Sequence, residues 1–430
     1  MELTKKQISK LGKRLSDSEG NVCENDLEML QEYRKSFEAP LSDVFDQLRK
    51  LSIKVDPKSI VTYRIKRINT IIDKLRRFSK NPNGRMSLDN IVDIAGCRCI
   101  LHNEEQIYRL RDQLIKSYGT AISISDKHDY IKNPKESGYK SLHLYIKHPT
   151  YKRNVEIQLR TTEHHDWATL VEIIDLIFET KIKEGTKDYN GLKRFLQLFS
   201  RKDNLNKYEI KELIKIEQKN KIYKKICSVF KNNYLNVRKE WLSRQKKGCY
   251  YVIEANGCKK TSSIENFLSY DDAEKAYYDK YVKNKESNIV LTYLRDANFA
   301  QLSKAYANYI LTIHTFFDDY RTFIENNVLE ALKKEKLLKL LRELNLYRLI
   351  TVLYVDNLKY EINTLQKYCN EDNGDKSRIK KWTQELEIEI SYWKKNAEKF
   401  IEKQAQLLNY NRWSLYIIKI EYRLLNRKIK

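Results

Sequence analysis

The chain has 430 residues, of which 41% are hydrophobic and 33% charged, a balance that is typical of a folded globular protein and excludes a long disordered chain. No run is apolar for long enough to span a membrane, and the lysine-rich N-terminus lacks the apolar stretch of a signal peptide, so we expect a cytoplasmic protein without membrane contact. The formal net charge of +24 favours polyanionic partners such as nucleotides or RNA.

The front of the chain is rich in turns and predicts a mixed α and β structure. Residues 1–44 are expected to form short helices that lead into a domain at 45–200. Apolar residues at steps of three and four predict one amphipathic helix over residues 60–80. Strands are expected at 91–101 and 155–160, and further strands near residues 121 and 142.

The rear of the chain has no proline and only three of the eleven glycines, which predicts a mainly helical structure. We expect a basic helical linker at 201–248 and a small α/β module at 249–325. Two long helices should follow at 326–430, broken at Asn373-Gly374. The net charge is +8 for residues 1–200 and +16 for the remainder.

A row of polar residues runs along one face of the helix predicted at 60–80. Lys66, Thr70, Lys74 and Arg77 stand at i, i+4, i+8 and i+11, on the face opposite the apolar stripe. Three cations and a hydroxyl in a row would suit a triphosphate, whose charge has to be neutralised. A solvated basic face explains this pattern equally well by itself.

Two carboxylates lie within the predicted strands. Asp93 has apolar neighbours, and Glu156 alternates with Val155 and Ile157. A buried carboxylate is costly unless it is paired or binds a metal. If the two strands are neighbours, Asp93 and Glu156 can meet on one face and hold Mg²⁺ through oxygen ligands.

The segment 129–143 adds a proline- and glycine-containing loop. Its lysines supply positive charge, and Tyr130 and Tyr139 offer flat faces on which a base could stack.

Taken in order, these elements resemble the synthetase domain of the RelA/SpoT alarmone enzymes. Four motifs carry the resemblance: Arg64-x-Lys66 with Thr70, Lys74 and Arg77; Asp93-Ile-x-Gly96-x-Arg98; Asp129-Tyr-Ile-x-x-Pro-Lys135-x-x-Gly-Tyr139-x-Ser-Leu-His143; and Glu156-Ile-Gln158-x-Arg160-Thr161. The resemblance is confined to residues 45–200, less than half of the chain. It implies an α+β, nucleotidyltransferase-like domain with a mixed β-sheet flanked by helices, ahead of the helical rear part and its α/β module.

The resemblance also implies a role for each matching residue. Arg64 and Arg98 would hold the adenine of ATP, and Lys66, Thr70, Lys74 and Arg77 would hold its phosphates. Asp93 would bind Mg²⁺, and Glu156 would share the metal or take the proton of the acceptor's 3′-hydroxyl. Lys135, Tyr139, His143 and Gln158 would bind the acceptor.

The activity implied is that of a GTP pyrophosphokinase, which makes guanosine tetra- or pentaphosphate from ATP and GDP or GTP in the stringent response. Too few residues precede the domain for the hydrolase domain of the long enzymes, so synthesis without hydrolysis is expected. His128, Ser137 and Lys140 depart from the usual residues of the acceptor loop. The acceptor could therefore be an adenine nucleotide or the 3′ end of tRNA, as in toxic members of the family, and an inactive RNA-binding or sensor protein is a third reading.

The segment 201–248 supplies most of the excess charge of the rear half. It carries fifteen Lys or Arg against five Asp or Glu, with Tyr223, Phe230 and Tyr234 interleaved. Such a surface exceeds the needs of a small acceptor and would suit an RNA backbone. A solvated lysine-rich helix is an equal alternative, and oligomerisation stays open.

Overall fold

The computed structural model describes residues 3–429 apart from the segments 19–21, 80–85, 181, 183–188, 227–228, 230–236, 238–239, 242–247, 257–260, 286–287, 296–298, 311–313, 371–375 and 407–410. The chain divides into two compact units. The first unit comprises Met1–Thr169 and Gln245–Ile310, and the second comprises Leu170–Arg244 and Leu311–Lys430. The chain therefore leaves the first unit and later returns to it.

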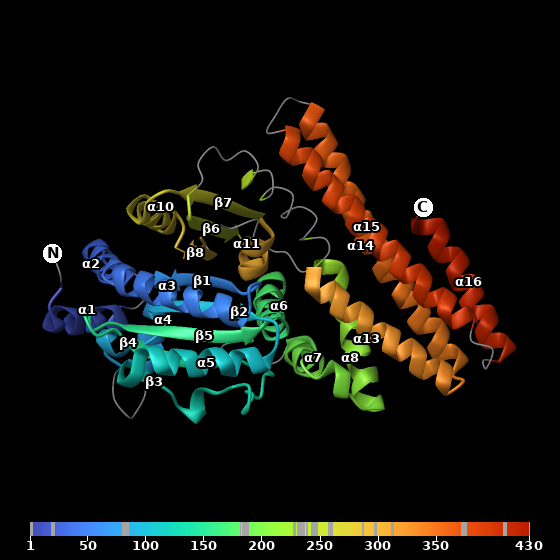
Figure 1. Cartoon of the computed structure of the whole chain (residues 1–430), viewed down its shortest axis with the longest axis horizontal. Coiled ribbons are helices and arrows are strands. Elements are labelled where there is room, and N and C mark those ends of the chain that lie inside the picture. Colours follow the sequence, from blue (N-terminus) through green and yellow to red (C-terminus); the bar gives the residue numbers. More distant parts are fainter. Residues whose placement is uncertain are drawn as a thin grey trace. The chain divides into compact units, whose positions relative to one another are not determined.

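The first unit is built on one mixed sheet of eight strands, in the order β3-β4-β5-β2-β1-β8-β6-β7 (Figure 1). These strands are β1 (Ile60–Ile65), β2 (Ala95–Leu101), β3 (Ile122–Ser123), β4 (Leu142–Lys147), β5 (Asn154–Thr161), β6 (Tyr250–Asn256), β7 (Thr261–Phe267) and β8 (Asn288–Tyr293). Within the described residues, β2 and β5 pair in parallel and the other pairs are antiparallel. The mixed sheet expected from the sequence is confirmed.

The front of the chain also forms helices. They are α1 (Lys5–Asp17), α2 (Glu24–Lys35), α3 (Glu38–Val55), α4 (Ile68–Ser79), α5 (Glu104–Tyr118) and α6 (Thr162–Phe178). Thr4 and Asn103 begin α1 and α5 with capping boxes, because each side chain accepts a hydrogen bond from the first turn of its helix. The α3 helix packs against β1, β2 and β5, and α1 packs against α4.

The helix predicted over residues 60–80 is wrong in its first part. Residues 60–65 form β1, and helix α4 begins only at Ile68. Val61 and Ile65 fit the helical spacing, but the segment is rich in β-branched and aromatic residues and is nearly all buried. Pairing with β2 on one side and β8 on the other outweighs the local helical pattern.

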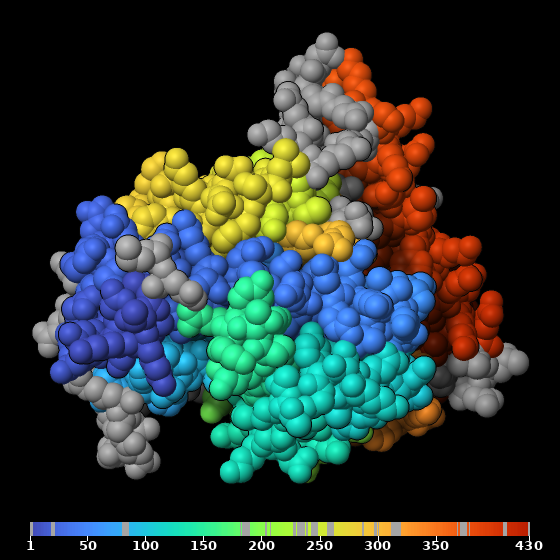
Figure 2. Space-filling view, turned by 60° about the vertical axis from the view of Figure 1, so that its left-hand side comes forward, coloured from blue at the N-terminus to red at the C-terminus, as the bar shows by residue number. Residues whose placement is uncertain are grey.

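Residues 250–293 of the small α/β module predicted at 249–325 extend the sheet of the first unit. Tyr63 and Arg64 of β1 pair with Tyr293 and Thr292 of β8, and β8 pairs in turn with β6. Helix α10 (Tyr270–Lys283) packs on β8 and β6. Figure 2 shows the yellow atoms of this segment against blue atoms from the front of the chain.

One hydrophobic core joins the module to the front of the chain. Val252, Tyr277 and Leu291 are buried in the same cluster as Phe45 and Tyr63. The hydroxyl of Tyr277 also accepts a hydrogen bond from the backbone N–H of Ile68, at the start of α4, at 3.2 Å. Residues 45–200 therefore do not complete a compact unit by themselves.

The second unit is helical. Its main elements are α7 (Leu192–Phe199), α8 (Lys207–Asn220), α13 (His314–Lys333), α14 (Leu337–Asn370), α15 (Lys376–Gln406) and α16 (Arg412–Ile429). Helix α14 packs against α13, α15 and α16 (Figure 1). The mainly helical rear is confirmed, but its end holds more helices than the two that were predicted. In the part of the chain that is described, no helix is both long and apolar enough to cross a membrane.

Two short helices complete the first unit. They are α11 (Phe299–Ala305) and α12 (Ala307–Ile310). Helix α12 packs on β6, β7 and β8, and the Oγ of Ser262 donates a 2.6 Å hydrogen bond to the carbonyl oxygen of Tyr309. The chain between the two helices is thereby fixed beside the sheet.

Candidate active site

Polar side chains line one face of the sheet across four neighbouring strands. Side chains that are direct register partners, or two residues apart in a strand, emerge on the same face. Two such rows cross the sheet, one of Thr62, Arg98, Gln158 and His143, and one of Arg64, Gly96, Glu156 and Tyr145. The register of β1, β2, β5 and β4 thus brings together residues from four separate parts of the chain.

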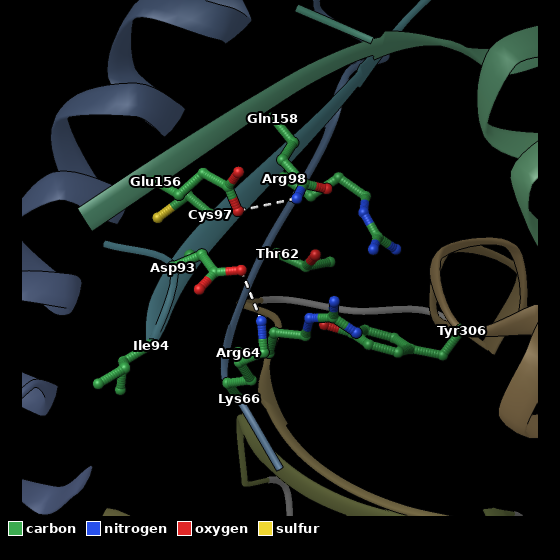
Figure 3. Close-up of a pocket in the computed structure, with 11 residues that line it drawn as sticks. Thr62, Arg64, Lys66, Asp93, Ile94, Cys97, Arg98, Glu156, Gln158 and Tyr306 are labelled. Atoms are coloured by element: carbon green, nitrogen blue, oxygen red, sulfur yellow. Dashed lines mark hydrogen bonds and ion pairs between the residues drawn. The ribbon is translucent and has the colours of Figure 1, made fainter. Parts of the chain in front are cut away.

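A cavity opens over these rows (Figure 3). It is lined by Thr62, Arg64, Lys66, Asp93, Ile94, Gly96, Cys97, Arg98, Glu156, Gln158 and Tyr306. Figure 3 shows the carboxylates of Asp93 and Glu156 on one side of this cavity, and the side chains of Arg64 and Arg98 directed toward Tyr306 on the other. The cavity therefore has a carboxylate side and a cationic side.

Asp93 is the charged centre of one end of the cavity. It lies in the turn before β2, not within the strand as was expected. Its carboxylate bonds to Lys66 Nζ at 2.5 Å and to Lys74 Nζ at 2.9 Å. Burial opposes the charged carboxylate, but the two lysines outweigh it and lower the pKa of Asp93 to about 2.

The four residues assigned to a triphosphate do not share one helix face. Lys66 lies in the loop before α4, whereas Thr70, Lys74 and Arg77 lie on the helix. Lys66 and Lys74 still converge on Asp93. Thr70 is half-buried and Arg77 is exposed, and neither is among the described residues that line the cavity.

Glu156 is buried, with both oxygens engaged. Its Oε1 lies 2.8 Å from His143 Nδ1, and its Oε2 accepts a 2.9 Å hydrogen bond from Gln158 Nε2. The hydroxyl of Tyr145 also lies 3.4 Å from Oε1. Burial raises the pKa of Glu156, but the hydrogen bond from His143 outweighs it, so the pKa falls below its usual value. Glu156 is held as a carboxylate.

The residues assigned to the acceptor lie next to Glu156. The hydroxyl of Tyr139 is 2.8 Å from His143 Nε2, and Lys135 Nζ lies 5.2 Å from the centre of the Tyr139 ring. Gln158 lines the cavity, whereas Lys135 is exposed. The structure therefore brings Tyr139, His143 and Gln158 together around the carboxylate, with Lys135 at the surface beside them.

Tyr306, between α11 and α12, is a cavity residue that the sequence did not indicate. It is only 2% exposed, and its hydroxyl bonds to Thr292 Oγ1 and lies 3.4 Å from the carbonyl oxygen of Tyr63. Arg98 donates a 3.3 Å hydrogen bond to the carbonyl oxygen of the preceding residue, Ala305. No motif marks Tyr306, because it enters the site from a segment far along the chain.

The carboxylates fit a magnesium ion that arrives with a phosphate ligand. In the described residues, no three Asp, Glu, His or Cys side chains gather as a metal cage, and Asp93 and Glu156 are the carboxylates that line this cavity. Mg²⁺ typically keeps several waters and binds through one or two carboxylates plus substrate phosphates. Two carboxylates beside Lys66 and Lys74 match that donor set.

Comparison with known proteins finds relatives for the front of the chain. Residues 63–181 match the family model described as "Region found in RelA / SpoT proteins". The chain is 31% identical over 137 residues to GTP pyrophosphokinase YjbM of Bacillus subtilis. This alignment covers 30% of this chain and 63% of that protein. It is 34% identical over 113 residues to GTP pyrophosphokinase YwaC of the same organism, covering 25% and 53%. The chain thus spans between about half and two thirds of these relatives.

Among solved structures, small alarmone synthetase 1 from Bacillus subtilis bound to its product pppGpp matches with 24% identity and a TM-score of 0.34, covering 40% of this chain and 90% of that chain. The family model begins in β1, ends just after α6 and contains Asp93, Glu156 and the acceptor loop. Residues 63–181 therefore match the RelA/SpoT region, in agreement with the ordered motifs of the sequence.

Proposed function

We propose that the chain transfers pyrophosphate from ATP to the ribose 3′-hydroxyl of GDP or GTP. In this reaction the 3′-oxygen forms a bond to the β-phosphorus, the bond from that phosphorus to the α-phosphate oxygen breaks, and AMP leaves. The observation that supports this proposal is the convergence of Asp93, Glu156, Lys66 and two arginines on one cavity of a RelA/SpoT region. Both similar proteins are named GTP pyrophosphokinases.

The donor would bind at the cationic side. Arg64 and Arg98 line the cavity with guanidinium groups that can stack on an adenine. Lys66 and Lys74 would move from Asp93 to the phosphates, with Thr70 and Arg77 on the same helix as Lys74. Phosphate oxygens would then replace the carboxylate as the partners of the lysines.

Asp93, once released, could take Mg²⁺ together with Glu156. The ion would neutralise charge on the phosphates during transfer. Asp93 stays ionised through the neutral pH range because its pKa is about 2. No change of protonation is needed before it binds a metal.

The acceptor would bind over Glu156. Glu156 would accept the 3′-hydroxyl proton as the new bond forms, since a buried carboxylate at the cavity wall can act as a general base. Tyr139, His143, Gln158 and Lys135 surround this position and would hold the base and phosphates of the acceptor.

Product analysis tests the proposal. The full chain is incubated with Mg²⁺ and β-labelled ATP against GDP, GTP, ATP or bulk tRNA in separate reactions. We expect label to appear on GDP and GTP, with AMP released in equal amount. Label on tRNA or ATP alone would show that the acceptor is not GDP or GTP. The absence of labelled product with all four acceptors would indicate an inactive synthetase fold.

RNA binding is a second candidate for the segment 201–248. On and just after α8, the lysines Lys211, Lys215, Lys219, Lys221, Lys224 and Lys225 are all exposed. Tyr223 is buried, and its hydroxyl donates to the carbonyl oxygen of Ile350, so it cannot stack on a base. Phe230 and Tyr234 lie outside the described residues. The observation that favours RNA is therefore the exposed lysine row, which suits a phosphate backbone.

Charge reversal separates this candidate from the acceptor assignment. Lys215, Lys219 and Lys224 are replaced together by Glu, with Lys116→Glu on α5 as a control for a single exposed lysine. We expect tRNA binding by the unchanged chain to fall steeply with salt and to be lost in the triple variant, with ATP affinity unchanged. Equal tRNA binding by the triple variant would contradict an RNA contact here.

A further inference from the structure

Arg160 lies behind the carboxylate side of the cavity without lining it. It follows Glu156 and Gln158 along one face of β5 and is 6% exposed. Its Nη2 donates a 2.6 Å hydrogen bond to the Tyr139 hydroxyl and a 3.1 Å hydrogen bond to Gln158 Oε1. One guanidinium nitrogen therefore holds two residues that come from different strands or loops.

Both of these residues lead to Glu156. Gln158 donates through Nε2 to Glu156 Oε2 at 2.9 Å. Tyr139 lies 2.8 Å from His143 Nε2, and the other nitrogen of that ring lies 2.8 Å from Glu156 Oε1. The five side chains thus form a closed ring of hydrogen bonds, Arg160–Tyr139–His143–Glu156–Gln158, in which each carboxylate oxygen is held by a separate branch.

We propose that Arg160 is a positioning residue that fixes Glu156 for proton removal, through Gln158 on one side and through Tyr139 and His143 on the other. The role given to Glu156 rests on the proposed function, but the ring itself does not. Arg160 does not line the cavity and so would act only through the residues that it holds. A rigid base is favoured because misplacement of a reacting group by about 1 Å can cost about a hundredfold in rate.

The charges around the ring agree with this arrangement. Burial raises the pKa of Tyr139, but Arg160 and then His143 outweigh it and lower the pKa to about 7. Burial lowers the pKa of His143, but Glu156 and Tyr139 outweigh it and raise the pKa. Other groups surround the ring. Lys135 and Tyr130 of the loop lie beside Tyr139. Asp93 and Tyr145 lie near Glu156, and His164 and His165 of α6 lie near Arg160.

The ring also gives Tyr139 a second role besides base stacking. A phenylalanine keeps the aromatic face but removes the hydroxyl that links Arg160 to His143. Stacking alone therefore predicts that Tyr139→Phe leaves transfer unchanged, whereas the ring predicts a fall in kcat with little change in the KM of the acceptor.

Kinetics of full-length variants test the proposal. Arg160→Met removes both hydrogen bonds at similar side-chain length, Arg160→Lys restores a charged donor, and Arg109→Met on the exposed face of α5 is the matched control. We expect Arg160→Met to lower kcat about 10- to 100-fold with the KM for ATP unchanged. Arg160→Lys should recover part of kcat.

A readout without turnover separates this inference from the proposed function. The near-ultraviolet absorbance of tyrosinate is titrated, and the curve of Tyr139→Phe is subtracted from that of the unchanged chain. We expect one tyrosine to ionise near pH 7 and to return toward its ordinary range in Arg160→Met, with circular dichroism confirming that both variants are folded. A Tyr139 that ionises at the same pH in the unchanged chain and in Arg160→Met overturns the ring, whatever the activity.

The remaining outcomes are also decisive. If labelled product forms but Arg160→Met keeps its kcat, the positioning role is wrong and the proposed function stands. If no acceptor is labelled while the tyrosine titration behaves as expected, the proposed function fails and the ring is retained as a structural feature.

Discussion

Both units bury charged side chains, but those at the cavity of the first unit are partnered differently from the pairs of the second unit. In the second unit Arg348 of α14 bonds to Glu421 of α16 at 2.7 Å, and the fully buried Glu343 bonds to its neighbour Arg342 at 2.8 Å. In the first unit Asp93 and Glu156 face a cavity, with partners that a ligand can replace. A buried charge needs a partner in either case. A structural pair has a fixed partner within the same helical bundle. A candidate site residue has a partner at a cavity wall.

The strongest test of the division into units is truncation. A fragment of residues 1–200 lacks β8, which pairs with β1, and lacks the part of the shared core that contains Tyr277 and Leu291. We expect it to be insoluble or to unfold without a cooperative transition, as measured by circular dichroism on heating. A fragment of residues 1–310 keeps all eight strands and should retain a transition. A well-folded and active 1–200 fragment would contradict a shared unit.

Within the first unit, Glu156→Gln should have the largest effect on transfer. The change is nearly isosteric but removes the charge of the proposed base and metal ligand, so kcat should fall roughly a hundredfold or more. Glu105→Gln on the exposed face of α5 serves as the matched control. A kcat within a few-fold of the unchanged chain would remove Glu156 from the mechanism.

Within the second unit, Trp393→Ala should affect stability and not chemistry. Trp393 is 1% exposed and lies 4.2 Å, centre to centre, from the ring of Tyr354. Its loss should lower the free energy of unfolding by about 3–5 kcal/mol. Urea unfolding measures this loss, and Ile388→Ala, which truncates a side chain 69% exposed, should change it by less than about 0.5 kcal/mol. A large fall in kcat for folded Trp393→Ala at low temperature would contradict a purely structural role for Trp393.

The smallest expected effect is a pH dependence of stability from Asp93. Because its folded pKa is lowered from 3.8 to about 2, its contribution is fully present above about pH 4 and is lost as the pH falls through 2. Asp93→Asn should therefore cost about 2 kcal/mol of unfolding free energy at pH 6 and almost nothing near pH 2. Asp112→Asn, at an exposed carboxylate on α5, should show no such difference. Equal costs for Asp93→Asn at both pH values would contradict the ion pairs with Lys66 and Lys74.

The sequence predicted which residues come together at the cavity better than it predicted the elements that carry these residues. Alternation in residues 154–160 placed Glu156, Gln158 and Arg160 on one face, and parallel pairing of β2 and β5 then brought Asp93 near Glu156 as expected. Lys66 was placed on a helix because Val61, Ile65, Ile68 and Ile72 recur at helical spacing. A strand and the following helix can share that spacing by chance, and only long-range pairing decides between them.

Other features had no local signal. The pairing of β1 with β8 and the entry of Tyr306 into the cavity join segments far apart in the sequence. The ring around Glu156 depends on side-chain contacts that join Tyr139 of the loop to β4 and β5. Neither the motif at 129–143 nor the motif at 156–161 could reveal it alone. Such contacts follow from the tertiary fold rather than from spacing within one element.

The order of the strands has a consequence for synthesis of the protein. Thr292 of β8 donates to the carbonyl oxygen of Tyr63 in β1 across a sequence separation of 229 residues. At the roughly 5–20 residues per second of translation, β1 would wait roughly 10–50 seconds for its neighbour while the ribosome completes the intervening chain. A central strand with one unpaired edge is open to wrong pairing during that time. The nascent chain would therefore acquire a complete sheet only late in translation, and a prematurely released product would be a candidate for aggregation or proteolysis.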